Sequence, residues 1–131
     1  MPRHNISSAS PYEASIGFSR AVRVGNAIHV AGTAPIAPDG TTAGPGDAYA
    51  QTKRCLEIIR QAIESAGGKL TDVVRTRIMV TDMAYWEDVG RAHGEVFREV
   101  RPASSLFEVT RLVHDEWLVE IEADAVVEGD E

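Results

Sequence analysis

The chain has 131 residues, of which 44% are hydrophobic and 25% charged, a balance typical of a globular protein. At this length one core can bury roughly two thirds of the unfolded surface, so we expect a single domain over residues 1–131. Asp and Glu number 20 against 13 Lys and Arg, and the net charge of -7 argues against a nucleic-acid partner.

The single cysteine and the lack of long apolar segments indicate the cellular compartment of the protein. Cys55 has no partner for an internal disulfide and lies among apolar residues in a helical pattern, which predicts a buried thiol in a reducing, cytoplasmic setting. No segment approaches the roughly 18 apolar residues of a membrane span, and the first residues hold no apolar signal core. We therefore expect neither secretion nor membrane insertion.

The first elements in chain order are an arm, a hairpin and a loop. Residues 1–15 form a polar N-terminal arm. Residues 17–24 and 27–31 are predicted to pair as strands around the small polar turn Gly25-Asn26. Turn formers then fill the stretch from Pro35 to Gly46, which predicts a loop within the domain.

A helix follows this loop. Asp47 is its predicted N-cap, and Gly67-Gly68 is its predicted stop. Between them the apolar residues recur at helical spacing, at Cys55, Leu56, Ile59, Ala62, Ile63 and Ala66.

The next two elements are a strand and a second helix. Residues 74–80 alternate with period two, with Val74, Thr76, Ile78 and Val80 on one side. Asp82 is the predicted cap of the second helix, which Arg101-Pro102 ends. Its expected inner face carries Trp86, Val89, His93, Val96, Phe97 and Val100.

Strands at 105–112 and 117–127 complete the chain before an acidic tail at 128–131. The order ββαβαββ predicts an α+β fold in which both helices cover one face of a single sheet. The last strand should turn one apolar row toward those helices: Val119, Ile121, Ala123, Ala125 and Val127. We expect the other face of the sheet, with Leu106, Thr110, Leu112 and Leu118 among acids, to meet a second subunit.

Several segments carry a family resemblance. They are RPASSLFEVTRL at 101–112, VEIEA at 119–123, VGN at 24–26, VAGTAP at 30–35 and AGG at 66–68. With these segments the chain resembles the RidA/YjgF family, also described as endoribonuclease L-PSP. The resemblance implies a chorismate-mutase-like fold with a mixed sheet, a homotrimer with ligand clefts between subunits, and hydrolysis of enamines or imines to a carbonyl product and ammonia without a cofactor.

The resemblance also implies a site. Gly32 and Glu120 match the family's glycine after the second strand and the acid that helps position water. Ser104 stands where active members have the arginine that binds the substrate carboxylate. The remaining site positions carry replacements, with Phe18, Gly90 and Leu106 in place of tyrosine, asparagine and cysteine. We expect Glu120 to approach residues 18–20 of a neighbouring subunit.

The residues themselves allow plainer interpretations. Glu120 could move a proton at an imine carbon, or be an interface acid paired with arginine. Ser104 and Ser105 could bind a ligand oxygen, or satisfy backbone groups at a strand end. A replacement cation could come from Arg20, Arg75, Arg77 or Arg111, for each of which a salt bridge with sheet-face acids is the favoured interpretation.

The histidines and the overall charge limit the classes of function that this sequence allows. His4, His29, His93 and His114 lack metal-ligand spacing, so we predict no metal, and His93 is expected to be a packing residue. The leading hypothesis is a small-metabolite imine or enamine deaminase with an unusual substrate range. A non-catalytic metabolite-binding or regulatory trimer is the alternative, and an endoribonuclease would need a basic track that this chain lacks.

Overall fold

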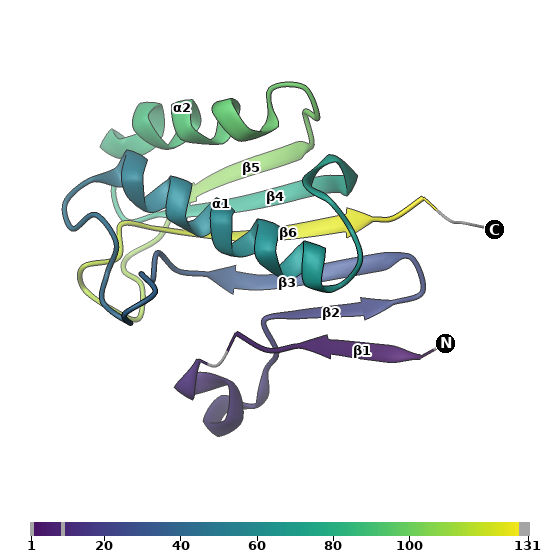
Figure 1. The fold of residues 1–131 in the computed structure, drawn as a ribbon. Coiled ribbons are helices and arrows are strands. Elements are labelled where there is room, and N and C mark those ends of the chain that lie inside the picture. The colour runs from purple at the N-terminus through teal and green to yellow at the C-terminus, as the bar shows by residue number, and fades with distance from the viewer. Residues whose placement is uncertain (1, 9, 129–131) are drawn as a thin grey trace.

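Six strands form one mixed sheet in the order β1-β2-β3-β6-β4-β5, in which every neighbouring pair is antiparallel except β4 and β5 (Figure 1). The computed structural model describes residues 2–8 and 10–128, so residues 129–131 of the predicted tail lie outside it. The strands are β1 (Arg3–Ile6), β2 (Ala21–Val24), β3 (Ala27–Thr33), β4 (Val73–Val80), β5 (Ala103–Glu108) and β6 (Val119–Val126).

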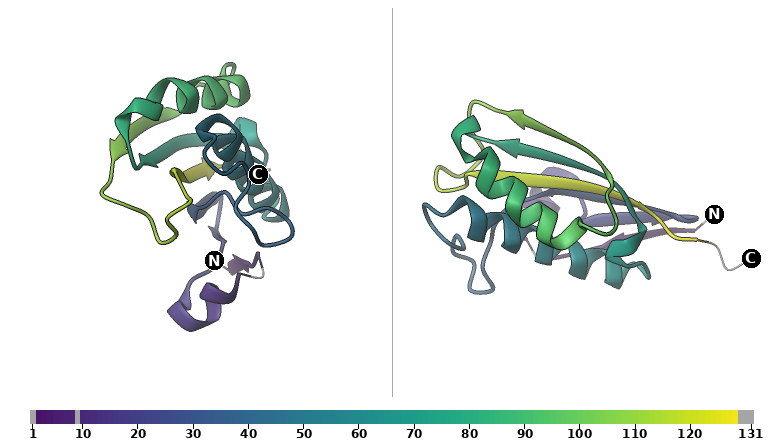
Figure 2. Two further views of the ribbon diagram at one scale, coloured as in Figure 1. Left: turned by 90° about the vertical axis from the view of Figure 1, so that its left-hand side faces the viewer. Right: turned by 90° about the horizontal axis from the view of Figure 1, so that it is seen from above.

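Both main helices, α1 (Ala48–Ser65) and α2 (Trp86–Phe97), pack on the same face of the sheet (Figure 2). Three single-turn elements accompany them: η1 (Glu13–Gly17), η2 (Leu70–Asp72) and η3 (Met83–Tyr85). This arrangement confirms the α+β prediction with two helices on one face. Within the part of the chain that the structure describes, neither helix is apolar enough over a sufficient length to cross a membrane.

Helix α1 begins and ends where the sequence predicts. The Asp47 side chain accepts a hydrogen bond from the Ala50 amide at 3.0 Å, which satisfies one of the free donors at the helix start. Gly67 has a φ of 91°, and the Gly68 amide donates to the Ile63 carbonyl, so a glycine in the left-handed region closes the last turn. Cys55, Leu56 and Ile59 are buried against the sheet.

Strand β4 differs from the simple alternation expected of it. The pairing with β6 shifts register between Val73 and Arg75, so Val73 is buried whereas Val74 is 48% exposed. The alternation holds from Thr76 onward. On β6 the predicted buried row of Val119, Ile121, Ala123 and Ala125 is confirmed.

The second helix starts later than predicted, because Asp82 caps the short turn η3 through the Ala84 amide and α2 begins at Trp86. Trp86 was expected on the inner face of this helix but is 55% exposed, whereas Ala92, which the prediction did not include, is buried. Helix α2 ends at Phe97, and after a turn Arg101 adopts a φ of 55° just before Pro102.

The terminal parts of the fold carry further corrections. Part of the predicted N-terminal arm forms β1, which pairs with β2. The strand predicted at 17–24 covers only residues 21–24, and Gly17 belongs to η1. Four residues are too short a segment to show a period-two pattern. At the other end β5 stops at Glu108, and residues 109–118 form the connection to β6.

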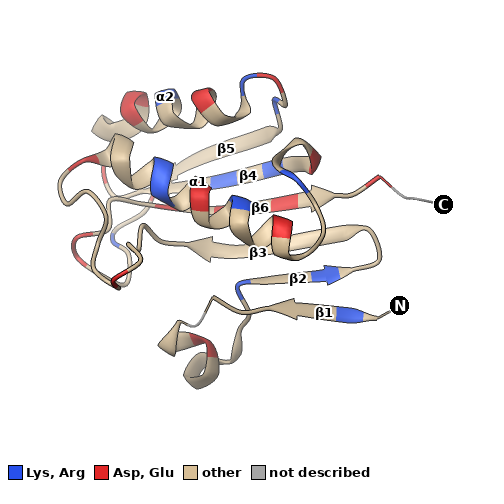
Figure 3. Ribbon diagram, in the orientation of Figure 1, with Lys and Arg blue, Asp and Glu red and all other residues tan. Residues whose placement is uncertain are grey.

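The composition predicted for the open face of the sheet is partly wrong. Leu106 pairs with Ile78 and packs against the core beneath the helices, and Leu118 packs there too. Thr110 and Leu112 lie in the connection after β5. The open face instead carries charged rows, with basic positions on β4 beside acidic positions on β6 (Figure 3).

Candidate functional site

A β-bulge interrupts the pairing of β3 with β6 close to the sequence-predicted glycine. The register shifts between Val30 and Thr33, and the two residues between them, Ala31 and Gly32, lie opposite Glu122 alone. Bulges of this kind bend a strand and redirect its neighbours, and they are frequent next to active sites. Gly32 therefore stands at a point where the sheet is locally reshaped.

Glu120 lies directly over Gly32. A Cβ atom added to Gly32 would be 2.2 Å from Oε2 of Glu120, so only glycine leaves room for the carboxylate in this position. Burial raises the pKa of Glu120 above its ordinary value, the Arg20 cation opposes this rise, and the neighbouring Glu122 adds to it. The result is a carboxyl group whose affinity for a proton is increased, as a group that exchanges protons with a substrate requires.

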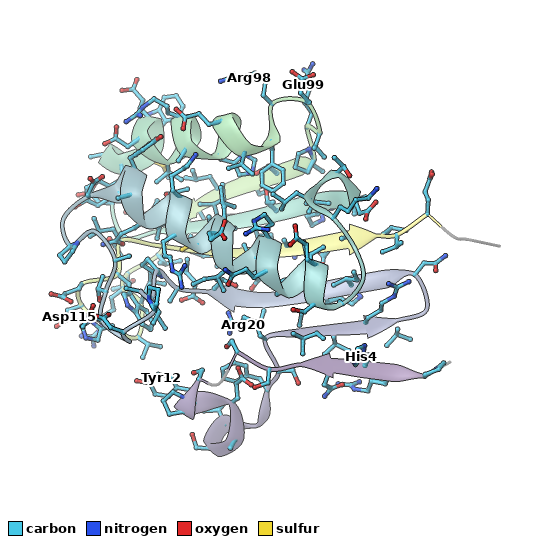
Figure 4. All side chains as sticks on the ribbon, in the orientation of Figure 1. His4, Tyr12, Arg20, Arg98, Glu99 and Asp115 are labelled. Atoms are coloured by element: carbon cyan, nitrogen blue, oxygen red, sulfur yellow. The ribbon has the colours of Figure 1, made fainter. Side chains whose placement is uncertain are left out.

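Arg20 comes from the segment just before β2 and is only 8% exposed (Figure 4). Its Nη1 atom donates to the Gly32 carbonyl at 2.8 Å and to Thr33 Oγ1 at 2.9 Å. Its guanidinium carbon is 5.7 Å from the centre of the Phe18 ring. Burial lowers the pKa of Arg20, while Glu13 and Glu120 raise it. We call Phe18, Arg20, Gly32 and Glu120 the Glu120 cluster.

Ser104 lies in a different cluster, on the covered face of the sheet. Thr76 Oγ1 donates to Ser104 Oγ at 2.8 Å and is 2.9 Å from Nε2 of His93 on α2. Thr76 is fully buried, whereas Ser104 on the edge strand β5 is exposed. Burial lowers the pKa of His93, and its ring packs 4.7 Å from the Phe97 ring. Thr76, His93 and Ser104 form the Ser104 cluster.

The remaining sequence-predicted positions divide between the two faces. Ser105 pairs with Arg77 on the open face, while Leu106 belongs to the helix-covered face. Gly90 lies on α2, where an added Cβ would meet no atom within 4 Å. Within one chain Gly32 and Glu120 lie together, and Arg20 connects Gly32 with Phe18. Ser104 and Glu120 lie on opposite faces of the sheet.

Arg20 is the member of the Glu120 cluster that sequence reasoning did not single out. It was one of four arginines for which a salt bridge was the favoured interpretation. That interpretation is confirmed for Arg77, whose Nη1 lies 3.3 Å from both Glu122 and Asp124. Glu120 has Arg20 of its own chain near it. Its expected approach to residues 18–20 of a neighbouring subunit stays a prediction. The burial of Arg20 depends on pairing between strands that are far apart in the sequence, so the residues around Arg20 do not predict it.

Other candidate groups have structural explanations. Cys55 is fully buried, and burial raises the pKa of its thiol, which confirms the predicted buried cysteine. His29 Nδ1 contacts Asp124 at 2.8 Å on the open face. Over residues 2–8 and 10–128, no group of three His, Cys, Asp or Glu side chains is placed to hold a metal ion.

The sequence has clear relatives. The endoribonuclease L-PSP family model matches residues 8–127. An uncharacterized protein of Streptomyces coelicolor is 38% identical over 120 residues, which are 92% of this chain and 89% of that protein. A RutC family protein of Pyrococcus abyssi is 40% identical over 111 residues, covering 85% of this chain and 87% of the relative.

Solved structures agree with these matches. Rv2704 of Mycobacterium tuberculosis, a member of the YjgF/YER057c/UK114 family, superposes with a TM-score of 0.87 and is 46% identical, covering 96% of this chain and 100% of that chain. The YjgF protein of E. coli gives a TM-score of 0.79 at 32% identity, covering 93% of each chain. The similarity spans nearly the whole chain rather than one motif.

Proposed function

Because the chain belongs to the RidA/YjgF family, whose model is the endoribonuclease L-PSP model, we propose that it hydrolyses an enamine or imine of a small polar metabolite to a carbonyl product and ammonia. The observation that carries this proposal is the placement of Glu120 over Gly32, partly buried and with a raised pKa. A carboxyl group in this state can exchange a proton at intermediate pH.

Glu120 has a definite task in this reaction. Water attacks the imine carbon while the Glu120 carboxylate takes one of its protons and passes it to the imine nitrogen, which gives an amino alcohol. The carboxylate then takes the hydroxyl proton as the carbonyl forms and delivers it to the nitrogen as the carbon–nitrogen bond breaks and ammonia leaves. No cofactor enters this scheme, since the atoms of imine and water account for carbonyl and ammonia.

The two clusters provide a physical reason for an oligomer. The Glu120 cluster lies on the open face and the Ser104 cluster on the covered face, so one chain alone cannot present both to the same ligand. A second chain can bring its Ser104 cluster against the Glu120 cluster of the first. We propose that this occurs in a homotrimer with three such clefts, as the family resemblance implies.

Substrate range follows from Ser104. A hydroxyl group provides a weaker contact to a carboxylate than the charge-assisted, bidentate contact of an arginine. Ser104 is also already bonded to Thr76. The preferred substrate is therefore an imine whose binding does not depend on a simple 2-oxo acid carboxylate. The buried thiol of Cys55 suits the cytoplasm as the place of this reaction.

The test is direct. Imines are generated from a panel of amino acids by an amino-acid oxidase with semicarbazide present as a trap, and loss of trapped product measures competing hydrolysis. Wild-type protein should reduce trapping for at least one polar substrate, and Glu120→Gln should not. Ligand binding without turnover would favour the metabolite-binding trimer, and salt-sensitive RNA cleavage by homogeneous protein would favour the ribonuclease.

A further inference from the structure

Arg20 is bonded to the bulge on which the Glu120 carboxylate lies. The bulge removes the Gly32 carbonyl from the regular ladder, and Arg20 Nη1 donates to that carbonyl at 2.8 Å. The same Nη1 atom donates to the buried hydroxyl of Thr33 at 2.9 Å. The guanidinium therefore fixes the local backbone geometry immediately beneath Glu120.

Burying the Arg20 guanidinium costs free energy of folding, and no carboxylate among the described residues forms an ion pair that would offset this cost. The Nε atom of Arg20 is buried and has no hydrogen-bond partner among the described residues, which costs about 1–3 kcal/mol. An arginine retained for stability alone is normally paired with a carboxylate in contact. Within residues 2–8 and 10–128, no ion pair joins Arg20 to either acid that influences it, Glu13 or Glu120.

Of these two acids, Glu13 already has its own donors. Its oxygens accept hydrogen bonds from the Ser7 hydroxyl at 2.9 Å and from the Ser8 amide and hydroxyl at 2.9 Å and 2.7 Å. Glu120 forms no hydrogen bond or ion pair with another described residue. The Arg20 cation therefore faces one carboxylate that is fully engaged and one that is available to a ligand or to water.

We propose that Arg20 is a positioning residue for Glu120, which holds the bulge under the Glu120 carboxylate and keeps that carboxylate in its ionised, proton-accepting form. This role depends on the proposed function in one respect, namely that Glu120 is the base. It assigns Arg20 no contact with the substrate. In this respect it differs from an arginine that binds a substrate carboxylate.

The charges around Glu120 fix the sign of the expected effect. Arg20 faces it from the segment before β2, Glu122 lies on its own strand, and Cys55 approaches from α1 with its thiol protonated. Arg20 is the one group of these three that favours the charged carboxylate. Removing its charge should raise the pKa of Glu120, so the base is lost at a higher pH as the solution is acidified.

Arg20→Gln and Arg20→Lys test this in the full-length protein. The Glu120 carboxyl carbon is followed by ¹³C NMR against pH in glutamate-labelled protein, with Glu120→Gln used to assign the resonance. Arg20→Gln should raise the pKa of Glu120 by about one unit, a tenfold change in proton affinity, as expected for loss of a nearby opposite charge. Arg20→Lys keeps the charge and should remain near wild type. Arg91→Gln, which removes an exposed arginine of α2 that contacts Asp88, is the matched control.

The outcomes separate this inference from the proposed function. An unchanged pKa of Glu120 in Arg20→Gln, or an equal rise of that pKa in Arg91→Gln, would overturn the positioning role even if imines are hydrolysed. If Arg20→Gln does not fold, Arg20→Lys decides the question. A rise of one unit in the pKa of Glu120 in Arg20→Lys would contradict the positioning role, because lysine retains the positive charge. Absence of any imine turnover would refute the proposed function and leave the titration to decide the role of Arg20. Where turnover is found, the acidic limb of the kcat/KM profile should move upward with the Glu120 titration.

Discussion

Replacing Gly32 with alanine tests whether the position of the Glu120 carboxylate matters for catalysis. The added Cβ would lie 2.2 Å from Oε2, against roughly 3.3 Å for the shortest ordinary C···O contacts, so the carboxylate must move by about 1 Å. Gly32 is not in the left-handed region, so alanine adds no backbone strain. A displacement of about 1 Å from productive geometry can reduce a rate about 100-fold.

The assay is imine hydrolysis at saturating and limiting substrate, with thermal unfolding measured on the same samples. We expect kcat/KM to fall about 100-fold while the fold persists, because the side chain that must yield ends in a flexible carboxylate. Gly94→Ala is the control, since an added Cβ there meets no atom within 4 Å and the helix should gain about 1 kcal/mol. Unchanged turnover in Gly32→Ala would refute the reasoning, because it would mean that catalysis does not depend on where this carboxylate lies.

Further predictions address the base, the assembly, the thiol and the missing arginine. Glu120→Gln should abolish imine hydrolysis and leave the mass of the assembly unchanged, as measured by light scattering. Wild-type protein should have the mass of a trimer at micromolar concentration, and a monomer mass would contradict the two-chain site. Cys55 should not react with a thiol reagent in the native protein but should react after unfolding, since its thiol is fully buried. Ser104→Arg should increase kcat/KM for an imine of a simple 2-oxo acid.

The elements that local patterns define were predictable from the sequence. Helix α1 has both its cap at Asp47 and its glycine stop, and β6 keeps strict alternation over its whole length. Two features depend on pairing between distant strands and were not predictable. Val73 rather than Val74 enters the core because the ladder with β6 shifts register, and β1 forms because a neighbouring strand is available to pair with it.

The site shows the same division. Gly32 and Glu120 could be identified from the resemblance, and the structure places one over the other. Arg20 could not be identified from the sequence, because an arginine before a strand is usually exposed. Its burial results from its contact with the bulge, which only the folded sheet creates. Leu106 was assigned to the wrong face, since its side depends on which residue of β4 it pairs with.

The position of Ser104 decides what an arginine could achieve there. Ser104 is exposed on an edge strand, so a longer side chain can leave the covered face without opening the core, while Thr76 keeps its contact with His93. A charge-assisted contact to a substrate carboxylate is about twice as strong as a neutral one, so Ser104→Arg should raise kcat/KM for iminopyruvate about tenfold or more. Ser105→Arg is the matched control, because Ser105 pairs with Arg77 on the opposite face and should give no gain. Efficient wild-type turnover of iminopyruvate that Ser104→Ala leaves unchanged would show that another cation holds the carboxylate and that Ser104 lies outside the ligand cleft.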